Sequence, residues 1–346
     1  MKTSRFKSMN RARLLSGLIL LAMFSVSEAQ TLKIATVVPE GSGWMVSMRA
    51  GAAEISERTE GRVKFKFYAG GVQGNDKQVQ RKMRIGQLHG GAFTPTALAI
   101  FQKDAQLYSM PMLFNNQEEV DFVRGKMDHK LHALLEQAGY IDFGFGGGGF
   151  AHLMSNDPIA NLEDMKSQKV WIPDGDKVAY DAIQTLGVSP VAMPITDVLT
   201  GLQTELLNAI MGPPAGTIIM QWNTGVKYIT ELPLAYIYAA LVVEKKYFDK
   251  IQPADQLIVR EVMEGVYQGF DKLSVKDNED AYQALLDDGL KPVTPDQGQF
   301  SVWREAVSAS NHTLADEGLI DKNLLLEIEC YLSAHRSGDM NKDCSL

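Results

Sequence analysis

From about residue 30 onward, the hydrophobic positions alternate between the spacing of a strand and the spacing of a helix. Residues 32–37 form a short apolar run, residues 44–55 carry apolar side chains at helical spacing, and 63–67 alternates with a period of two. Residues 75–83 form a second candidate helix that begins with an asparagine suited to capping, and 88–93 again favours a strand. This alternation of strands and helices predicts a parallel α/β sheet.

The same pattern starts again after a glycine-rich segment. Strand-like runs occur at 169–172, 189–193 and 208–211, and helical spacing occurs at 176–186 and 195–207. The sequence therefore predicts a second α/β lobe.

Beyond Ala254 the chain is predicted to be mostly helical. The longest apolar run after the N-terminus, 235–243, has nine residues and predicts a buried strand, because a membrane helix needs about 20. One long helix is expected, with a single apolar stripe made of Ile258, Val262, Val266, Phe270 and Leu273.

Residues 1–29 have the layout of a secretory signal peptide. Five Lys and Arg residues precede the apolar run 14–26, and small residues occupy positions 27 and 29. An N-terminal membrane anchor is the alternative, but this run is short for a span. We expect cleavage near Ala29 and an exported, soluble chain that begins at Gln30.

Composition and charge restrict the function. The 346 residues are 45% hydrophobic and 22% charged, as in ordinary globular proteins. The formal net charge is −8, and it becomes −12 without the basic leader, which argues against a nucleic-acid surface. Export would allow the two cysteines, Cys330 and Cys344, to pair and tie down the C-terminus.

Motifs for catalysis or cofactors are weak. Residues 144–149 (GFGGGG) match a dinucleotide-binding spacing, but 150–154 read as a strand instead of the required helix. We interpret this run as a crossing between lobes. His129 and His132 lack a third metal ligand, and the acidic turn 174–176 is better explained as a helix cap. We therefore expect neither a cofactor nor enzymatic activity.

Several segments, in order, resemble one family. The chain is similar over about residues 31–250 to the solute-binding subunit of tripartite ATP-independent periplasmic (TRAP) transporters, of the C4-dicarboxylate-binding type. The segments that carry the resemblance are TVVPEGSGW (36–44), EGRVKFKFYAGGVQG (60–74), YSMPMLF (108–114), LGVSPVAM (186–193) and VLTGLQTELL (198–207).

The resemblance implies an α/β, two-lobed periplasmic-binding-protein fold with a long helix spanning the lobes and a helical C-terminal region. Residues 30–152 would form the first lobe, completed by roughly 236–275, and 153–235 the second, completed by part of 276–346. The lobes would close around a small-molecule ligand. The protein would deliver that ligand in the periplasm to the small and large integral-membrane permease subunits.

The sequence departs from the family where ligands are held. Trp171 stands where the family's Lys-Ile-Arg-Val-Pro stretch has its arginine. A second family arginine often follows a Gly-Phe pair, but here the pair that ends in Phe150 is followed by Ala151. The family's Asp-Gly-Gln-Glu-Asn-Pro segment has become, over its last four positions, Ile210, Met211, Gly212 and Pro213.

These departures remove the donors that a buried carboxylate needs and add apolar surface. They predict an apolar or neutral ligand, such as a terpenoid, sterol, quinone-like or fatty compound. Three alternatives remain: an organic acid held by another base such as Lys169, a cleft that has lost binding, and a ligand-sensing interaction protein without transport. Further candidate wall residues are Trp44, Met193, Met154 and Trp222.

Overall fold

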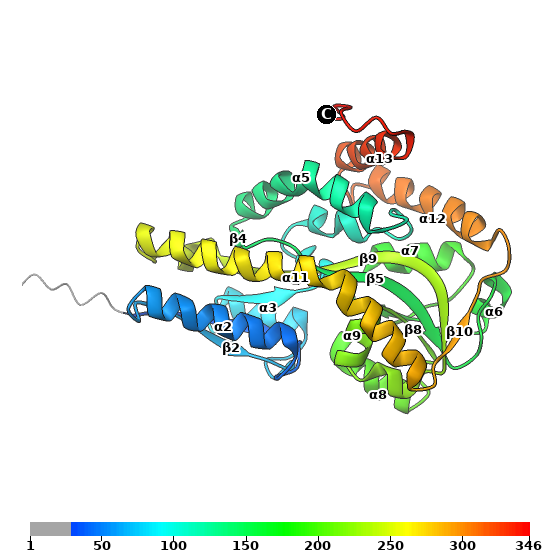
Figure 1. Ribbon diagram of the computed structural model, residues 1–346, viewed down its shortest axis with the longest axis horizontal. Helices are drawn as coiled ribbons and strands as arrows, with labels where there is room; N and C mark the ends of the chain where they lie inside the picture. Colours follow the sequence, from blue (N-terminus) through cyan, green and yellow to red (C-terminus); the bar gives the residue numbers. More distant parts are fainter. Residues whose placement is uncertain (1–28) are drawn as a thin grey trace, which may run out of the picture.

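The structure is a computed structural model that describes residues 29–346. Its centre is an eight-stranded mixed sheet. Six of the strands follow the order β2-β1-β3-β9-β5-β8, and the other two, β4 and β10, each pair with β9. Helices cover the sheet on both sides (Figure 1). The strands are β1 (Gln30–Thr36), β2 (Val63–Tyr68), β3 (Gly90–Phe93), β4 (Tyr140–Asp142), β5 (Gly146–Ser155), β8 (Ala209–Gly212), β9 (Tyr228–Glu244) and β10 (Lys291–Val293).

The predicted strands and helices of the first part form where expected. β1 pairs in parallel with β2 and β3, and α2 (Gly43–Arg58) and α3 (Asp76–Arg84) connect them. Asn75 caps α3 through a reciprocal capping box with Gln78. The parallel pairing predicted for this segment is confirmed, but the sheet as a whole is mixed, because β9 returns antiparallel between β3 and β5.

We call the part built around β1, β2 and β3 the first lobe and the part built around β8 and the two-stranded β6-β7 sheet the second lobe. β6 (Trp171–Pro173) and β7 (Val191–Met193) run parallel, and a bridge from Val170 to Ala209 joins them to β8. The helices of the second lobe are α6 (Leu162–Lys166), α7 (Lys177–Thr185), α8 (Val198–Gln203) and α9 (Pro214–Ile219), with short 3-10 turns η2 (Ile195–Asp197) and η3 (Trp222–Gly225).

Two long strands, β5 and β9, run through both lobes (Figure 1). Their pairing register shifts between Gly147 and Gly149 and again between Ala151 and Leu153, where β9 carries Pro233. The glycine run therefore enters a strand and no helix, as the interpretation of a lobe crossing requires.

Close packing against a long helix explains these glycines. α11 (Pro253–Asp287) crosses β5, and its Asn278 donates from Nδ2 to the carbonyl of Gly148 at 2.8 Å. A Cβ at Gly149 would lie 2.4 Å from that Nδ2, and Gly149 has φ +93°.

The apolar stripe of α11 packs against α2 and the sheet (Figure 1). Val262 and Phe270 are buried there, but Leu273, the expected last member of the stripe, is 56% exposed. Further along the same helix, Leu285 is buried in the second-lobe core, so α11 packs against both lobes.

The C-terminal helices divide between the lobes. α12 (Gln299–Asp316) packs against α7 of the second lobe, and α13 (Lys322–Ser337) packs against α5 (Gln117–Gln137) on the first-lobe side. A disulfide joins Cys330 of α13 to Cys344. The remaining short helices are α4 (Pro95–Leu98), η1 (Lys103–Ser109) and α10 (Lys245–Phe248).

The proposed signal peptide lies almost wholly outside the described residues. Within residues 29–346, no helix combines the length and hydropathy that crossing a bilayer would require.

Candidate functional site

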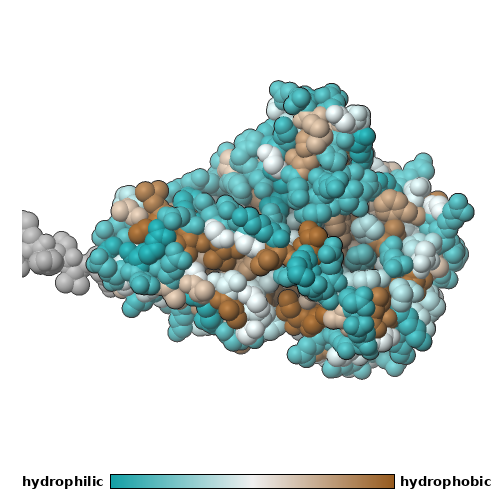
Figure 2. Space-filling model, viewed as in Figure 1, coloured by the Kyte–Doolittle hydropathy of each residue, from teal (hydrophilic) through white to brown (hydrophobic). Residues whose placement is uncertain are grey.

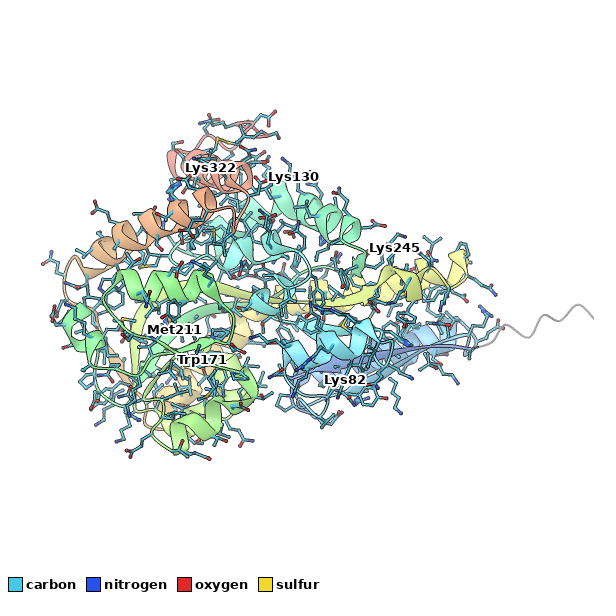
Figure 3. The ribbon with its side chains drawn as sticks, turned by 180° about the vertical axis from the view of Figure 1, so that it is seen from behind. Lys82, Lys130, Trp171, Met211, Lys245 and Lys322 are labelled. Atoms are coloured by element: carbon cyan, nitrogen blue, oxygen red, sulfur yellow. A yellow bond between two sulfur atoms is a disulfide. The ribbon has the colours of Figure 1, made fainter. Side chains whose placement is uncertain are left out.

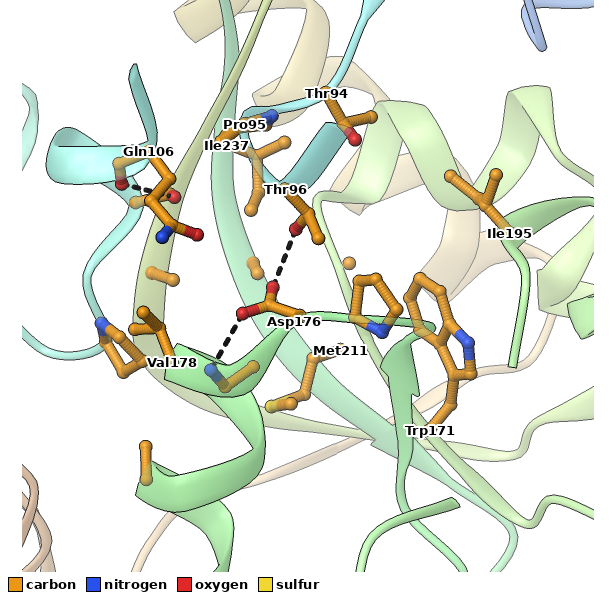
Figure 4. A pocket seen from close by; sticks show the side chains of 18 of the residues that line it. Thr94, Pro95, Thr96, Gln106, Trp171, Asp176, Val178, Ile195, Met211 and Ile237 are labelled. Atoms are coloured by element: carbon orange, nitrogen blue, oxygen red, sulfur yellow. Dashed lines mark hydrogen bonds between the residues drawn. The ribbon is translucent and has the colours of Figure 1, made fainter. Parts of the chain in front are cut away.

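A cleft opens between the two lobes and holds a cavity of about 280 Å³, near the lower end for small-molecule sites. The first lobe contributes the start of α3 and the β3–α4 segment. The second lobe contributes β6, α7, the end of β8 and η3, while β5, β9 and α12 close the inner side. The close-up in Figure 4 shows Thr96 and Pro95 facing Trp171 and Met211 across this cavity.

The second-lobe wall is apolar and aromatic. Trp171 is only 4% exposed, and its ring meets the ring of Trp222 edge-on at 5.2 Å between centroids. The Nε1 of Trp171 donates to the carbonyl of Met193 at 2.9 Å. Because its one donor is already bonded, Trp171 can offer a ligand only its ring.

Six of the predicted site residues lie on the cleft lining. β8 ends at the cleft, so that Met211 faces it and the following glycine and proline form its edge. The six are Ala151, Trp171, Met211, Gly212, Pro213 and Trp222.

The other five predicted residues lie elsewhere, and packing explains each position. Met154 and Ile210 are fully buried in the second-lobe core, on the strand face opposite to that of Met211. Trp44 stacks on Phe270 of α11 at 4.6 Å.

The remaining two, Phe150 and Met193, also lie off the lining. Phe150 packs against Tyr236 at 5.7 Å between ring centroids, on the side of the first-lobe core. Met193 packs against the second-lobe core and touches the site through its carbonyl, which accepts the Trp171 bond.

A cross-lobe hydrogen bond lies in the cleft. Thr96 Oγ1, at the start of α4, donates to Asp176 Oδ2 at 2.6 Å (Figure 4). Asp176 is also the N-cap of α7, as predicted, and its Oδ1 accepts from the amide of Ala179 at 2.9 Å. Burial raises the pKa of Asp176, while these hydrogen bonds act in the opposite direction.

Lys77 is the one basic side chain that lines the cleft within residues 29–346. Its Nζ lies 2.7 Å from Asp174 Oδ2, so that α3 of the first lobe is tied to the turn after β6. Both side chains are exposed, and their charges cancel.

Asp76 differs from the other charged residues of the cleft. It occupies the first turn of α3, is partly buried, and has no hydrogen-bond or ion-pair partner among residues 29–346. Burial alone raises the pKa of its carboxyl to about 6. The carboxylate is therefore largely ionised at neutral pH, and apart from the start of α3 nothing among residues 29–346 compensates its charge.

No arginine lines the cleft within the described chain, and the alternative base lies outside it. Lys169 donates from Nζ to the carbonyl of Glu205 at 2.8 Å on the exposed side of the second lobe. In Figure 3, Trp171 and Met211 lie close together, away from Lys130, Lys245 and Lys322. Those three lysines bond Glu327, Asp249 and Asp316, respectively.

Sequence reasoning missed the polar residues of the first lobe. Thr96, Gln106 and Asp76 line the cleft, yet none lies in a segment where the family pattern changes. The cap signal that identified Asn75 also places Asp76 at a helix start, which was the one available clue.

No group of three or more His, Cys, Asp or Glu side chains suited to a metal ion occurs within residues 29–346. His132, considered as a ligand, instead lies 2.7 Å from Asp142 through Nδ1 and stacks on Phe145.

Comparison with known proteins identifies the fold's family. The model of bacterial extracellular solute-binding protein family 7 (DctP) matches residues 34–317. The chain belongs to this family. As a family 7 protein it is a TRAP-type solute receptor and not an enzyme.

Two curated relatives are similar over most of this family 7 protein. The C4-dicarboxylate-binding periplasmic protein DctP of Rhodobacter capsulatus is 24% identical, over 86% of this chain and 90% of its own. The 2,3-diketo-L-gulonate-binding periplasmic protein YiaO of Escherichia coli is also 24% identical, over 86% and 91%.

Solved structures share the fold of this family 7 protein. The sugar acid binding protein DctPAm of Advenella mimigardefordensis, in complex with galactonate, has a TM-score of 0.81 at 20% identity, covering 90% of this chain and 99% of its own. A TRAP periplasmic solute-binding protein of Sulfurospirillum deleyianum with bound succinate has a TM-score of 0.79 at 19% identity, covering 88% and 99%.

Proposed function

We propose that this receptor captures a small, largely apolar organic ligand that carries no carboxylate, by closure of the two lobes. The single observation that carries the proposal is the composition of the cleft lining. It contains Trp171, Met211 and Trp222 on one wall and no arginine within the described chain, and Lys77 is already paired with Asp174.

Electrostatics support the proposal. A carboxylate taken out of water needs a fork of charged donors, and one buried without them costs several kcal/mol. In this cleft it would instead face the carboxylates of Asp76 and Asp176. The charge of the site therefore opposes an acid.

The walls supply the binding energy that such a ligand can use. Each Å² of apolar surface removed from water contributes about 25 cal/mol. The thioether of Met211 can also adjust to an irregular shape. Together with the two tryptophans it suits a compact hydrocarbon or ring skeleton.

An organic acid is the second candidate, and the neighbours favour it. The two solved structures compared above hold galactonate and succinate. For this chain, such a ligand would require Lys77 to leave Asp174 and turn toward the cavity, which would also give up a contact between the lobes.

Mass spectrometry of an organic extract from natively purified protein separates these candidates. A near-stoichiometric apolar compound without an acid group is the expected result. A stoichiometric organic acid, or a rise in melting temperature with succinate or galactonate, would contradict the proposal.

We also propose the cellular setting that the family suggests. The leader would direct export to the periplasm with cleavage near Ala29, and the closed receptor would deliver its ligand to a small and a large integral-membrane permease subunit. The intact mass of protein recovered from the periplasm tests the cleavage, and co-purification with the permease subunits tests the partnership.

A further inference from the structure

We propose that the ligand carries a protonated amine next to its apolar body and that Asp76 binds this amine. The inference rests on the proposed function, since it concerns the same cleft. It adds a polar end to the apolar ligand and names Asp76 as the residue that selects it.

The position of Asp76 is the first argument. The residue sits in the first turn of α3, on the first-lobe side of the cleft, opposite the second-lobe wall that carries Trp171. An apolar skeleton that lies on that wall would have its far end at the first lobe. A polar group at that end can reach Asp76 without disturbing the apolar contacts.

The absence of a partner is the second argument. Among residues 29–346, no donor bonds the Asp76 carboxylate, although the residue is partly buried. The oxygens of Asp76 are not among the fully buried polar atoms, so they remain open to the cleft and leave their acceptors for a ligand. Asn75, its neighbour, is occupied with the capping box of α3.

The charge of the whole cleft is the third argument. Its charged lining residues are Asp76, Lys77, Asp174 and Asp176. Lys77 and Asp174 neutralise each other, whereas Asp176 has hydrogen bonds from Thr96 and Ala179 but no cation. The carboxyl of Asp76 is left with neither a donor nor a cation, and an ammonium group would supply both.

An ammonium group fits better than a hydroxyl. A hydroxyl would satisfy one acceptor of Asp76 but would leave the negative charge of the cleft unchanged. An ammonium supplies three donors and a positive charge, and charge-assisted hydrogen bonds are about twice as strong as neutral ones.

The test is a calorimetric titration with matched probes. Hexyl, cyclohexylmethyl, phenethyl and adamantylmethyl skeletons would each be offered as the primary amine, the alcohol and the carboxylic acid. The wild type is compared with Asp76→Asn, which keeps the shape of the side chain but removes its charge. Glu118→Gln is the matched control, because Glu118 is exposed in the first turn of α5, outside the cleft.

We expect at least one amine to bind about tenfold more tightly than its alcohol. This preference should disappear in Asp76→Asn and persist in Glu118→Gln. Alcohols that bind as well as every amine, or amines unaffected by Asp76→Asn, would overturn the inference and leave the apolar-ligand proposal standing. Acids that bind best would overturn both, and failure of all four amines to bind would overturn the inference.

Discussion

The hydroxyl of Thr96 lies 2.6 Å from Asp176 Oδ2, so a residue at the start of α4 bonds the cap of α7 across the cleft. A second contact between the lobes joins Lys77 and Asp174 at 2.7 Å. Both contacts hold the first lobe against the helix and turn that follow β6. They describe a receptor whose lobes already touch around the cavity.

Replacing Thr96 by valine should weaken this closure. The variant loses the hydrogen bond from Thr96 to Asp176, which is worth about 1 kcal/mol, and leaves Asp176 with backbone amide donors only, Ala179 among them. We expect a larger radius of gyration in small-angle X-ray scattering and weaker ligand binding. Thr94→Val is the control, since Thr94 lines the same cleft but makes no capping bond. Equal effects of the two variants would contradict this role of Thr96.

Replacing Trp171 by arginine should change the ligand class. A guanidinium at this position supplies a fork of donors for a carboxylate. We expect succinate or galactonate to raise the melting temperature of the variant and not that of the wild type. The fold should lose about 2–4 kcal/mol, because a buried ring is replaced by a charge.

Trp171→Phe is the matched control for that substitution. It keeps an aromatic ring but removes the Nε1 bond to Met193, at a cost of about 1 kcal/mol. It should gain no response to organic acids. If it responds as the arginine variant does, added space and not charge explains the effect.

Asp76→Asn should stabilise the empty protein at neutral pH. The fold raises the pKa of Asp76 to about 6. Ionisation of this carboxyl therefore opposes folding in full above pH 6, and the effect fades as the pH falls toward the ordinary pKa of an aspartate. The pKa shift corresponds to about 3 kcal/mol in the free energy of unfolding. The expected gain of the variant is smaller, about 1–2 kcal/mol, because Asp76 is partly exposed and because asparagine loses the interaction with the helix dipole.

Chemical denaturation across pH checks this prediction. The advantage of Asp76→Asn should be full at pH 7 and should vanish near pH 4, where the wild-type carboxyl is protonated in the fold. The other charged groups of the cleft, Lys77, Asp174 and Asp176, are unchanged in the variant. A difference that does not vary with pH would show that the charge of Asp76 is not its cause.

Removing the disulfide should destabilise the protein without changing the cleft. Cys330 and Cys344 are 14 residues apart, and closing a loop of that size stabilises a fold by about 3 kcal/mol in the chain-entropy description. Cys330→Ser with Cys344→Ser should lower the melting temperature. Ligand affinity should remain the same, because neither cysteine lines the cavity.

Local patterns in the sequence predicted much of the fold. The periods along 32–93 and the Asn75 cap depend on neighbouring residues, and these elements formed as expected. The reversed direction of β9 depends on contacts with β3 and β5, which lie far away in the sequence. A pattern read along one segment holds no information about such a pairing.

The site shows the same division between local and distant information. Trp171 and Met211 could be placed because strands fix which side chains share a face. Met154 and Ile210 are apolar in the same segments, but the alternation turns them into the core. Asp76 becomes part of the site only because the second lobe comes to rest opposite α3, which sequence spacing does not encode.

The route of the C-terminal helices has a mechanical consequence. α12 packs against α7 and α13 against α5, so the five residues between them, 317–321, join a helix on the second lobe to a helix on the first. This elbow, where Gly318 has φ +79°, is anchored on the first lobe, because the amide of Asp321 bonds Asp104 and Ile320 is buried beside α13. Separation of the lobes would then change the distance between α13 and the part of α12 that packs on α7. A pair of spectroscopic labels, one on α13 and one on the face of α12 that points away from Trp303 and Val307, would therefore report the opening of the cleft without entering its lining.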